Sequence, residues 1–129
     1  MIIFKEFITR NYIKLNTSKY FVFGDNDMRI GFGGQAKEIR GEPNSIGIRV
    51  KKGPGIEPSC YYYDSEYEDN IKKIEEDFQV VEKLLKQGRT VVFPSAGIGT
   101  GLGKLKDNAP KTLKYINNRI YGFYVEYGE

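Results

Sequence analysis

Residues 90–103 read TVVFPSAGIGTGLG and give the strongest indication of the fold. The first four residues are β-branched or aromatic, which is typical of a buried strand. They run into Pro94 and then into a loop with glycine at every second position from Gly97 to Gly103. Such a loop is costly to order unless something fixes it, and a diphosphate wrapped by backbone N–H groups would do so. This stretch therefore predicts a core strand that delivers a phosphate-binding loop.

A second stretch repeats this arrangement earlier in the chain. The expected strand 20–23 stops at a Gly-Asp-Asn turn, and a glycine run up to Gly34 leads into an expected helix over 35–40. Amide groups exposed at such a helix start can bind a phosphate. The spacing of Gly31, Gly33 and Gly34 differs from the GxGxxG dinucleotide fingerprint, and no Walker A motif occurs. Two glycine loops at the ends of core strands predict one shared crevice that holds a phosphorylated nucleotide.

The remaining apolar pattern predicts the other helices and strands. Strands are expected over 1–8, 20–23, 45–50, 90–93 and 120–127, and helices over 35–40 and 67–87. A final helix is expected after an Asn108 cap, with Pro110 in its first turn. Alternating strands and helices predict a single α/β domain over 1–129, with helices on both faces of a sheet. Side chains expected in the core from the long helix are Ile71, Ile74, Phe78, Val81 and Leu84.

Composition excludes several classes of function. The 129 residues include no histidine, which removes histidine-based catalysis and most zinc sites. The single cysteine, Cys60, excludes an internal disulfide and favours a reducing compartment. The net charge of +3 is too small to indicate nucleic-acid binding by itself. With no signal or membrane-spanning run, we expect a cytoplasmic monomer that contacts no membrane and needs no cofactor or metal.

The expected ligand contacts follow from the two loops. A carboxylate such as Asp25, at the end of a strand, can accept hydrogen bonds from a ribose hydroxyl or an adenine amino group. Arg29 and Arg40 could contact phosphates, but isolated arginines are usually surface residues, and that interpretation is preferred here. The alternative for the first loop is a tight turn that Asp25 caps. The residues expected to contact the ligand are Gly24, Asp25, Asn26, Gly31, Gly33, Gly34, Gln35, Ser95, Ala96, Gly97, Ile98, Gly99, Thr100, Gly101 and Leu102.

Taken together, these segments resemble the macrodomain family. Residues 23–41 (FGDNDMRIGFGGQAKEIRG) are similar to its first loop, and residues 91–105 (VVFPSAGIGTGLGKL) to the loop that wraps the diphosphate and distal ribose. Residues 46–52 (IGIRVKK) and 109–127 follow in the matching order, so the resemblance runs from about Lys19 onward. It implies a three-layer α/β/α sandwich with a mixed central sheet, and a site for ADP-ribose.

Within macrodomains, the chain is most similar to the compact class that removes terminal ADP-ribose from acidic side chains. That class includes the macrodomain of the antitoxin that removes ADP-ribose from DNA. The resemblance places its catalytic lysine at Lys51, where the amine would attack the anomeric carbon and form a Schiff base. Gly103 stands where the class has its catalytic aspartate, which leaves Asp107 as the candidate carboxylate. Lysines after a strand are more commonly a solvated strand end, and that alternative stays open for Lys51 and Lys52.

Three functions are therefore compared. The first is an ADP-ribosyl hydrolase that acts on modified protein or nucleic acid, with Lys51 and Asp107 as catalytic residues. The second is a binding module that reads or sequesters an ADP-ribose-derived nucleotide. The third is a small structural or interaction protein, against which the paired glycine loops count. If the second loop holds the diphosphate, a bulky residue at Gly99 is expected to abolish binding and spare the fold.

Overall fold

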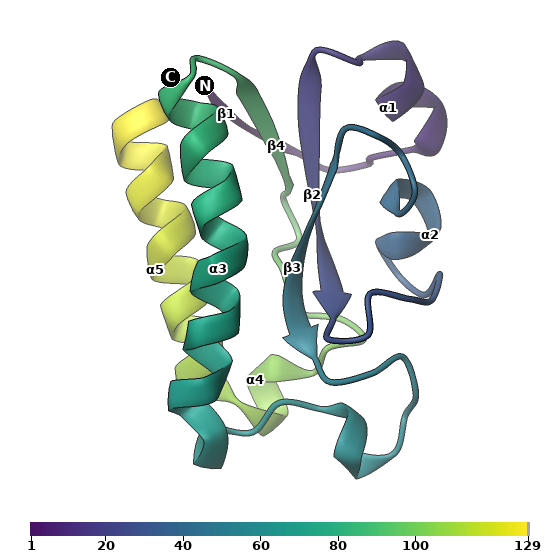
Figure 1. Cartoon of the computed structure of the whole chain (residues 1–129), viewed down its shortest axis with the longest axis vertical. Helices are drawn as coiled ribbons and strands as arrows, with labels where there is room; N and C mark the ends of the chain where they lie inside the picture. Colours follow the sequence, from purple (N-terminus) through teal and green to yellow (C-terminus); the bar gives the residue numbers. More distant parts are fainter. Residues whose placement is uncertain (129) are drawn as a thin grey trace.

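A computed structural model describes residues 1–128 as a mixed α/β fold built on a four-stranded sheet (Figure 1). The strand order is β1-β4-β2-β3, and all three pairings are parallel. The strands are β1 (Ile2–Lys5), β2 (Lys19–Asn26), β3 (Ser45–Lys51) and β4 (Thr90–Pro94). The helices are α1 (Arg10–Leu15), α2 (Ala36–Ile39), α3 (Tyr67–Lys86), α4 (Leu105–Asn108) and α5 (Pro110–Tyr127), with short 3₁₀ turns at Pro58–Cys60 and Asp64–Glu66. The predicted α/β class is confirmed.

Helices lie on both sides of the sheet. The long helices α3 and α5 run side by side over one face, while α1 and α2 lie on the other (Figure 1). On the α3 side, Phe78 is fully buried and its ring lies 5.8 Å from that of Phe123 in α5. On the α2 side, Ile39 packs with Phe21 of β2 in a second apolar cluster. None of the helices within residues 1–128 is long and apolar enough to span a bilayer.

The C-terminal segment corrects one predicted strand. Residues 120–127 form the end of α5, so the predicted closing strand is wrong, and the sheet is wholly parallel rather than mixed. The aromatic content of this segment is typical of strands. However, Ile116, Ile120 and Phe123 recur at steps of four and three residues and are buried against the sheet. Here the helical period of buried residues outweighs local propensity.

The other predicted elements are present, with differences in their bounds and details. The predicted strand 1–8 ends at Lys5, and the strand predicted over 20–23 continues through the expected turn to Asn26, because it pairs with β3 there. The helix α1 was not predicted, because only Ile13 of its six residues is buried and no apolar period extends beyond it. Asn108 ends α4 instead of capping α5, which begins at the expected Pro110. In α3, the expected core residues Ile74, Phe78 and Val81 are buried, whereas Ile71 and Leu84 are half-buried.

The two edges of the sheet differ. Along β3, the Gly47 carbonyl accepts a hydrogen bond from Arg29 (3.0 Å), and the Arg49 amide donates to Asp77 of α3 (2.7 Å). Arg29 and Asp77 also pair with each other at 2.6 Å. Their side chains therefore satisfy edge groups that another strand would otherwise use. At the opposite edge, β1 pairs only with β4 among the strands of residues 1–128.

Candidate functional site

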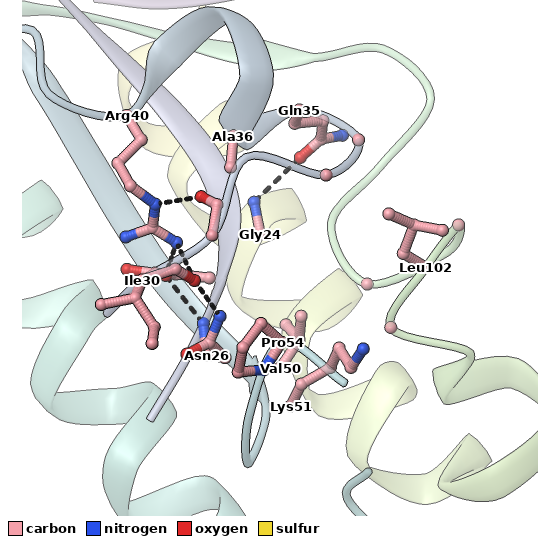
Figure 2. Close-up of a pocket in the computed structure, with 17 residues that line it drawn as sticks. Gly24, Asn26, Ile30, Gln35, Ala36, Arg40, Val50, Lys51, Pro54 and Leu102 are labelled. Carbon is pink, nitrogen blue, oxygen red and sulfur yellow. Dashed lines mark hydrogen bonds and ion pairs between the residues drawn. The ribbon is translucent and has the colours of Figure 1, made fainter. Parts of the chain in front are cut away.

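A cavity of about 300 Å³ lies between the two glycine loops (Figure 2). The loops follow β2 and β4, and the C-terminal residues of β3 complete the wall. Parallel strands place all their carboxyl ends at one edge of the sheet, so loops that are distant in sequence meet there. The cavity is lined by Gly24, Asp25, Asn26, Ile30, Gly31, Gly33, Gly34, Gln35, Ala36, Arg40, Val50, Lys51, Pro54, Gly99, Gly101, Leu102 and Gly103.

Most of the predicted site residues meet at this cavity. Every residue expected from the first loop lines it, together with Lys51 and three residues of the second loop. The second-loop residues outside its lining are Ser95, Ala96, Gly97, Ile98 and Thr100. Ile98 is instead fully buried in the main core, and the Thr100 hydroxyl donates to the Ala96 carbonyl at 2.8 Å. The predicted catalytic residue Asp107 is exposed on α4 and does not line the cavity.

Asp25 is held by cations of the protein itself. Its side chain, 3% exposed, pairs with Arg40 of the first-loop segment and with Arg29 at 3.0 Å. One oxygen also accepts the Asn26 amide at 2.8 Å. Arg40 further donates to the carbonyl of Gly31 at 2.6 Å, which ties the glycine run to the sheet (Figure 2). The carboxylate is therefore a structural centre of the first loop, rather than the free acceptor that the sequence suggested.

Arg40 was wrongly interpreted as a surface residue. Its side chain is 13% exposed, lines the cavity, and has its guanidinium 5.2 Å from the ring centre of Phe23. The signal that was available is its spacing, since Arg40 lies four residues after Ala36 and so shares its face of the short helix. Pro54, which also lines the cavity, comes from a loop whose pattern gave no sign of this position.

Gln35 connects the two loops. Its side-chain oxygen accepts the amide of Gly24 at 2.8 Å, and its side-chain nitrogen donates to the carbonyl of Gly97 at 2.9 Å. A Cβ placed on Gly33 would lie 2.9 Å from Cδ1 of Leu102, so the second loop also reaches the first through an apolar contact. The hydrogen bonds of Gln35 and the contact of Leu102 with Gly33 thus hold the two loops at a fixed separation.

Lys51 is the cation of the cavity that forms no ion pair within 4 Å among residues 1–128, although it contributes, after backbone and side-chain hydrogen bonds, to the lowered pKa of the nearby Glu57. It is 8% exposed, and its ammonium donates to the carbonyl of Gly55 at 2.8 Å. The same nitrogen lies 4.6 Å from the ring centre of Tyr61, which pairs with Lys51 in an isolated antiparallel bridge. A buried ammonium with one neutral acceptor retains donor capacity, because it carries three N–H groups. The neighbouring Lys52 differs, since it pairs with Glu66 at 2.6 Å.

The position of the expected catalytic aspartate is tightly packed. A Cβ on Gly103 would lie 3.1 Å from Cα of Gly99 and 3.1 Å from Cγ2 of Val50. Both neighbours would have to shift to admit any side chain. Within residues 1–128 there is also no group of three or more cysteine or acidic side chains placed to hold a metal ion.

The expectation for Gly99 also needs correction. Its φ is 77°, and a Cβ there would lie 2.4 Å from Cδ1 of the buried Leu105. A bulky residue at Gly99 would therefore damage the fold as well as the cavity. Gly101 also lines the cavity, but it has no atom within 4 Å of an added Cβ and no positive φ. Gly101 is the position at which a side chain can obstruct the cavity and leave the core intact.

The geometry defines a class of α/β protein: a parallel sheet with a cavity between two glycine loops at the carboxyl ends of its strands. Residues 3–119 match a family of unknown function, DUF7831, and the chain belongs to this family. Comparisons with curated proteins and with solved structures each give no match.

Proposed function

We propose that the chain binds ADP-ribose, or an ADP-ribosylated group, in the cavity between its two glycine loops. The observation that carries this proposal is the meeting of both loops with the buried Lys51 around one cavity. Its volume of about 300 Å³ lies at the lower end of ligand pockets, which suits a diphosphate with an adjoining ribose. The helices on both faces of the sheet and the resemblance of the loops favour a macrodomain-like α/β/α sandwich.

A glutamate at Gly101 tests this proposal. The carboxylate would project beside the diphosphate and repel it, and the Cβ of the new side chain would meet nothing within 4 Å. We expect calorimetry to show ADP-ribose binding by the wild type and at least a tenfold loss in Gly101→Glu. Gly122→Glu is the matched control, because it adds the same charge at an open, exposed position on α5. Equal binding by wild type and Gly101→Glu would contradict the proposal.

Binding without efficient turnover is the function that the site supports best. Asp107 lies outside the cavity lining, Gly103 has no side chain, and Asp25 is held by two arginines. Proton transfer by a positioned acid or base typically contributes about 10²–10⁴-fold to a rate. A chain that reads or sequesters an ADP-ribosyl group is therefore favoured over an efficient hydrolase.

One observation keeps slow hydrolysis as a second candidate, namely that Lys51 lines the cavity. Its neutral amine would form a C–N bond to the anomeric carbon as the bond to the leaving group breaks. The ring C–O bond would then open, with a proton passing to the ring oxygen, to give an imine, which water would hydrolyse to free the lysine and ADP-ribose. Borohydride with an ADP-ribosylated substrate would trap an adduct, and peptide mapping would place it. An adduct on Lys51 supports the hydrolase, whereas unimpaired hydrolysis by Lys51→Ala would exclude this route.

A further inference from the structure

The hydrogen-bond acceptors of the cavity are already used by the protein. Among the lining residues within 1–128, acceptor atoms occur on the side chains of Asp25, Asn26 and Gln35. The Asn26 oxygen accepts the amide of Met28 at 3.0 Å. The Gln35 oxygen accepts the amide of Gly24, and both oxygens of Asp25 accept from arginines. Each of these oxygens therefore already has a donor.

Most carbonyl groups of the two glycine loops are occupied in the same way. Donors within the protein bond to the carbonyls of Ile30, Gly31, Gly33, Gly34, Gly97, Gly99 and Gly101. Several of these bonds come from the first turn of α2 and the start of α4, which follow the loops directly. The carbonyls of Leu102, Gly103 and Pro54, in contrast, receive no hydrogen bond within residues 1–128.

Donors, in contrast, remain available. Gly33, Gly34, Gly101, Leu102 and Gly103 line the cavity, and their backbone amides have no hydrogen-bond partner within residues 1–128. Lys51 adds an ammonium that forms no ion pair within 4 Å in the same part of the chain. A cavity that offers N–H groups and a cation, but few free acceptors, is complementary to anionic oxygen atoms.

We propose that this cavity recognises the diphosphate of its ligand and does not distinguish the base. An adenine amino group is a hydrogen-bond donor, and each side-chain oxygen of the cavity lining already accepts a hydrogen bond from the protein. The phosphoryl oxygens match the loop amides and the ammonium of Lys51. The ligand class is therefore nucleoside and sugar diphosphates as a group. This conclusion rests on the proposed binding function and assigns recognition to the diphosphate part of the ligand.

A comparison of ADP with IDP tests base recognition directly. IDP carries a carbonyl oxygen where ADP has the amino group, and an N1–H where ADP has an acceptor nitrogen, so the pair exchanges donor and acceptor along that edge of the base. We expect calorimetry to give dissociation constants for ADP and IDP within about threefold, and no binding of adenosine. A preference for ADP of tenfold or more, about 1.4 kcal/mol, would overturn the inference.

Inorganic pyrophosphate separates this inference from the proposed function. If pyrophosphate, ADP and IDP bind but ADP-ribose does not, the inference holds and the ADP-ribose proposal fails. If ADP-ribose binds and adenosine competes with it while pyrophosphate does not, the base or its ribose carries the affinity and the inference fails. If no diphosphate binds, both fail.

Substitution of Lys51 gives an independent arm. We expect Lys51→Met to weaken ADP, IDP and pyrophosphate by a similar factor of about 10 to 100, the range of a charge-assisted hydrogen bond. Lys52→Met is the matched control, because Lys52 pairs with Glu66 outside the cavity. Thermal melting shows whether either variant is still folded. A folded Lys51→Met protein with unchanged affinity for pyrophosphate would contradict the role assigned to the ammonium.

Discussion

At the scale of single residues, Asp25 shows how a residue can lie in the expected place and have another role. Sequence position put a carboxylate at the end of a core strand, and the structure places it there. The arginines that occupy it come from four and fifteen residues further along the chain. The pairing of Asp25 with two arginines depends on where the first loop places Arg29 and Arg40 in space. Local sequence patterns do not specify that position.

Loss of Asp25 should therefore affect stability. Asp25→Ala removes the shared partner of Arg29 and Arg40, and Arg40 is then left largely buried without its carboxylate. Breaking a buried ion pair from one side costs about 3–5 kcal/mol. We expect a loss near 3 kcal/mol in urea unfolding, since Arg29 can turn to solvent. Asp107→Ala, at an exposed position, should stay within about 0.5 kcal/mol; equal effects of the two variants would refute the structural role of Asp25.

The two glycines of the second loop should also differ. Gly99→Ala must adopt a φ of 77° and place a Cβ against Leu105. The left-handed conformation alone costs about 1–2 kcal/mol for a residue with a Cβ. Gly101→Ala meets nothing within 4 Å and should change stability little. Differential scanning calorimetry should therefore give a lower melting temperature for Gly99→Ala than for Gly101→Ala. Equal melting temperatures of the two variants would contradict the difference assigned to these glycines.

At the scale of elements, strands and the long helix were predictable because their apolar periods are long and uninterrupted. The predicted range 67–87 compares with Tyr67–Lys86 for α3, and 45–50 with Ser45–Lys51 for β3. The C-terminal part of α5 was wrongly predicted as a strand. Its tyrosines favour strands locally, whereas its buried residues follow a helical period. The meeting of the two loops was predictable from strand direction. The bridge made by Gln35 was not, because it depends on a side-chain orientation.

The bridge between the loops makes its own prediction. Gln35→Ala should free the amide of Gly24 and the carbonyl of Gly97, so the loops lose their fixed separation. We expect faster hydrogen exchange at the Gly24 amide, with unchanged exchange in the centre of α3. Gln87→Ala, at the exposed C-terminal end of α3, is the control. Unaltered exchange at Gly24 in Gln35→Ala would show that the amide bridge does not hold the loop.

The packing of α3 on the sheet is testable through Phe78. The ring is fully buried between the sheet and Phe123 of α5. Phe78→Ala should cost about 3–5 kcal/mol through lost burial and the cavity left behind. Val80 is half exposed on the same helix, so Val80→Ala should cost far less. The comparison is made by urea unfolding, and a cost below about 1 kcal/mol for Phe78→Ala would contradict the assigned packing.

At the scale of the whole molecule, stability should fall in alkali. Burial, and then a hydrogen bond to Asp27, raises the pKa of the Tyr62 phenol above its ordinary value near 10. The unfolded chain therefore loses this proton first as the pH rises. Stabilisation by Tyr62 is complete below about pH 10 and decreases above it. The pKa of Tyr115 is likewise raised, to about 12, by burial and by its hydrogen bond to Glu75.

The contribution of Tyr62 can be isolated by substitution. Between pH 10 and pH 11, one such group lowers the free energy of unfolding by about 1 kcal/mol. Tyr62→Phe should reduce the alkaline loss of stability by that amount, measured by urea unfolding at the two pH values. Tyr121→Phe removes an exposed phenol and should leave the slope near that of the wild type. An identical slope in wild type and Tyr62→Phe would rule out the buried phenol as a source.

The unequal edges of the sheet limit how this chain can aggregate. A fibre built by docking β1 of one copy on β3 of the next needs both edges free. The Arg29–Asp77 pair already bonds to the Gly47 carbonyl and the Arg49 amide of β3, so a strand added along β3 would have to displace these contacts. Head-to-tail growth through the sheet would therefore cost an ion pair and hydrogen bonds of the native fold. The arginine that neutralises Asp25 thus also makes such polymerisation less favourable.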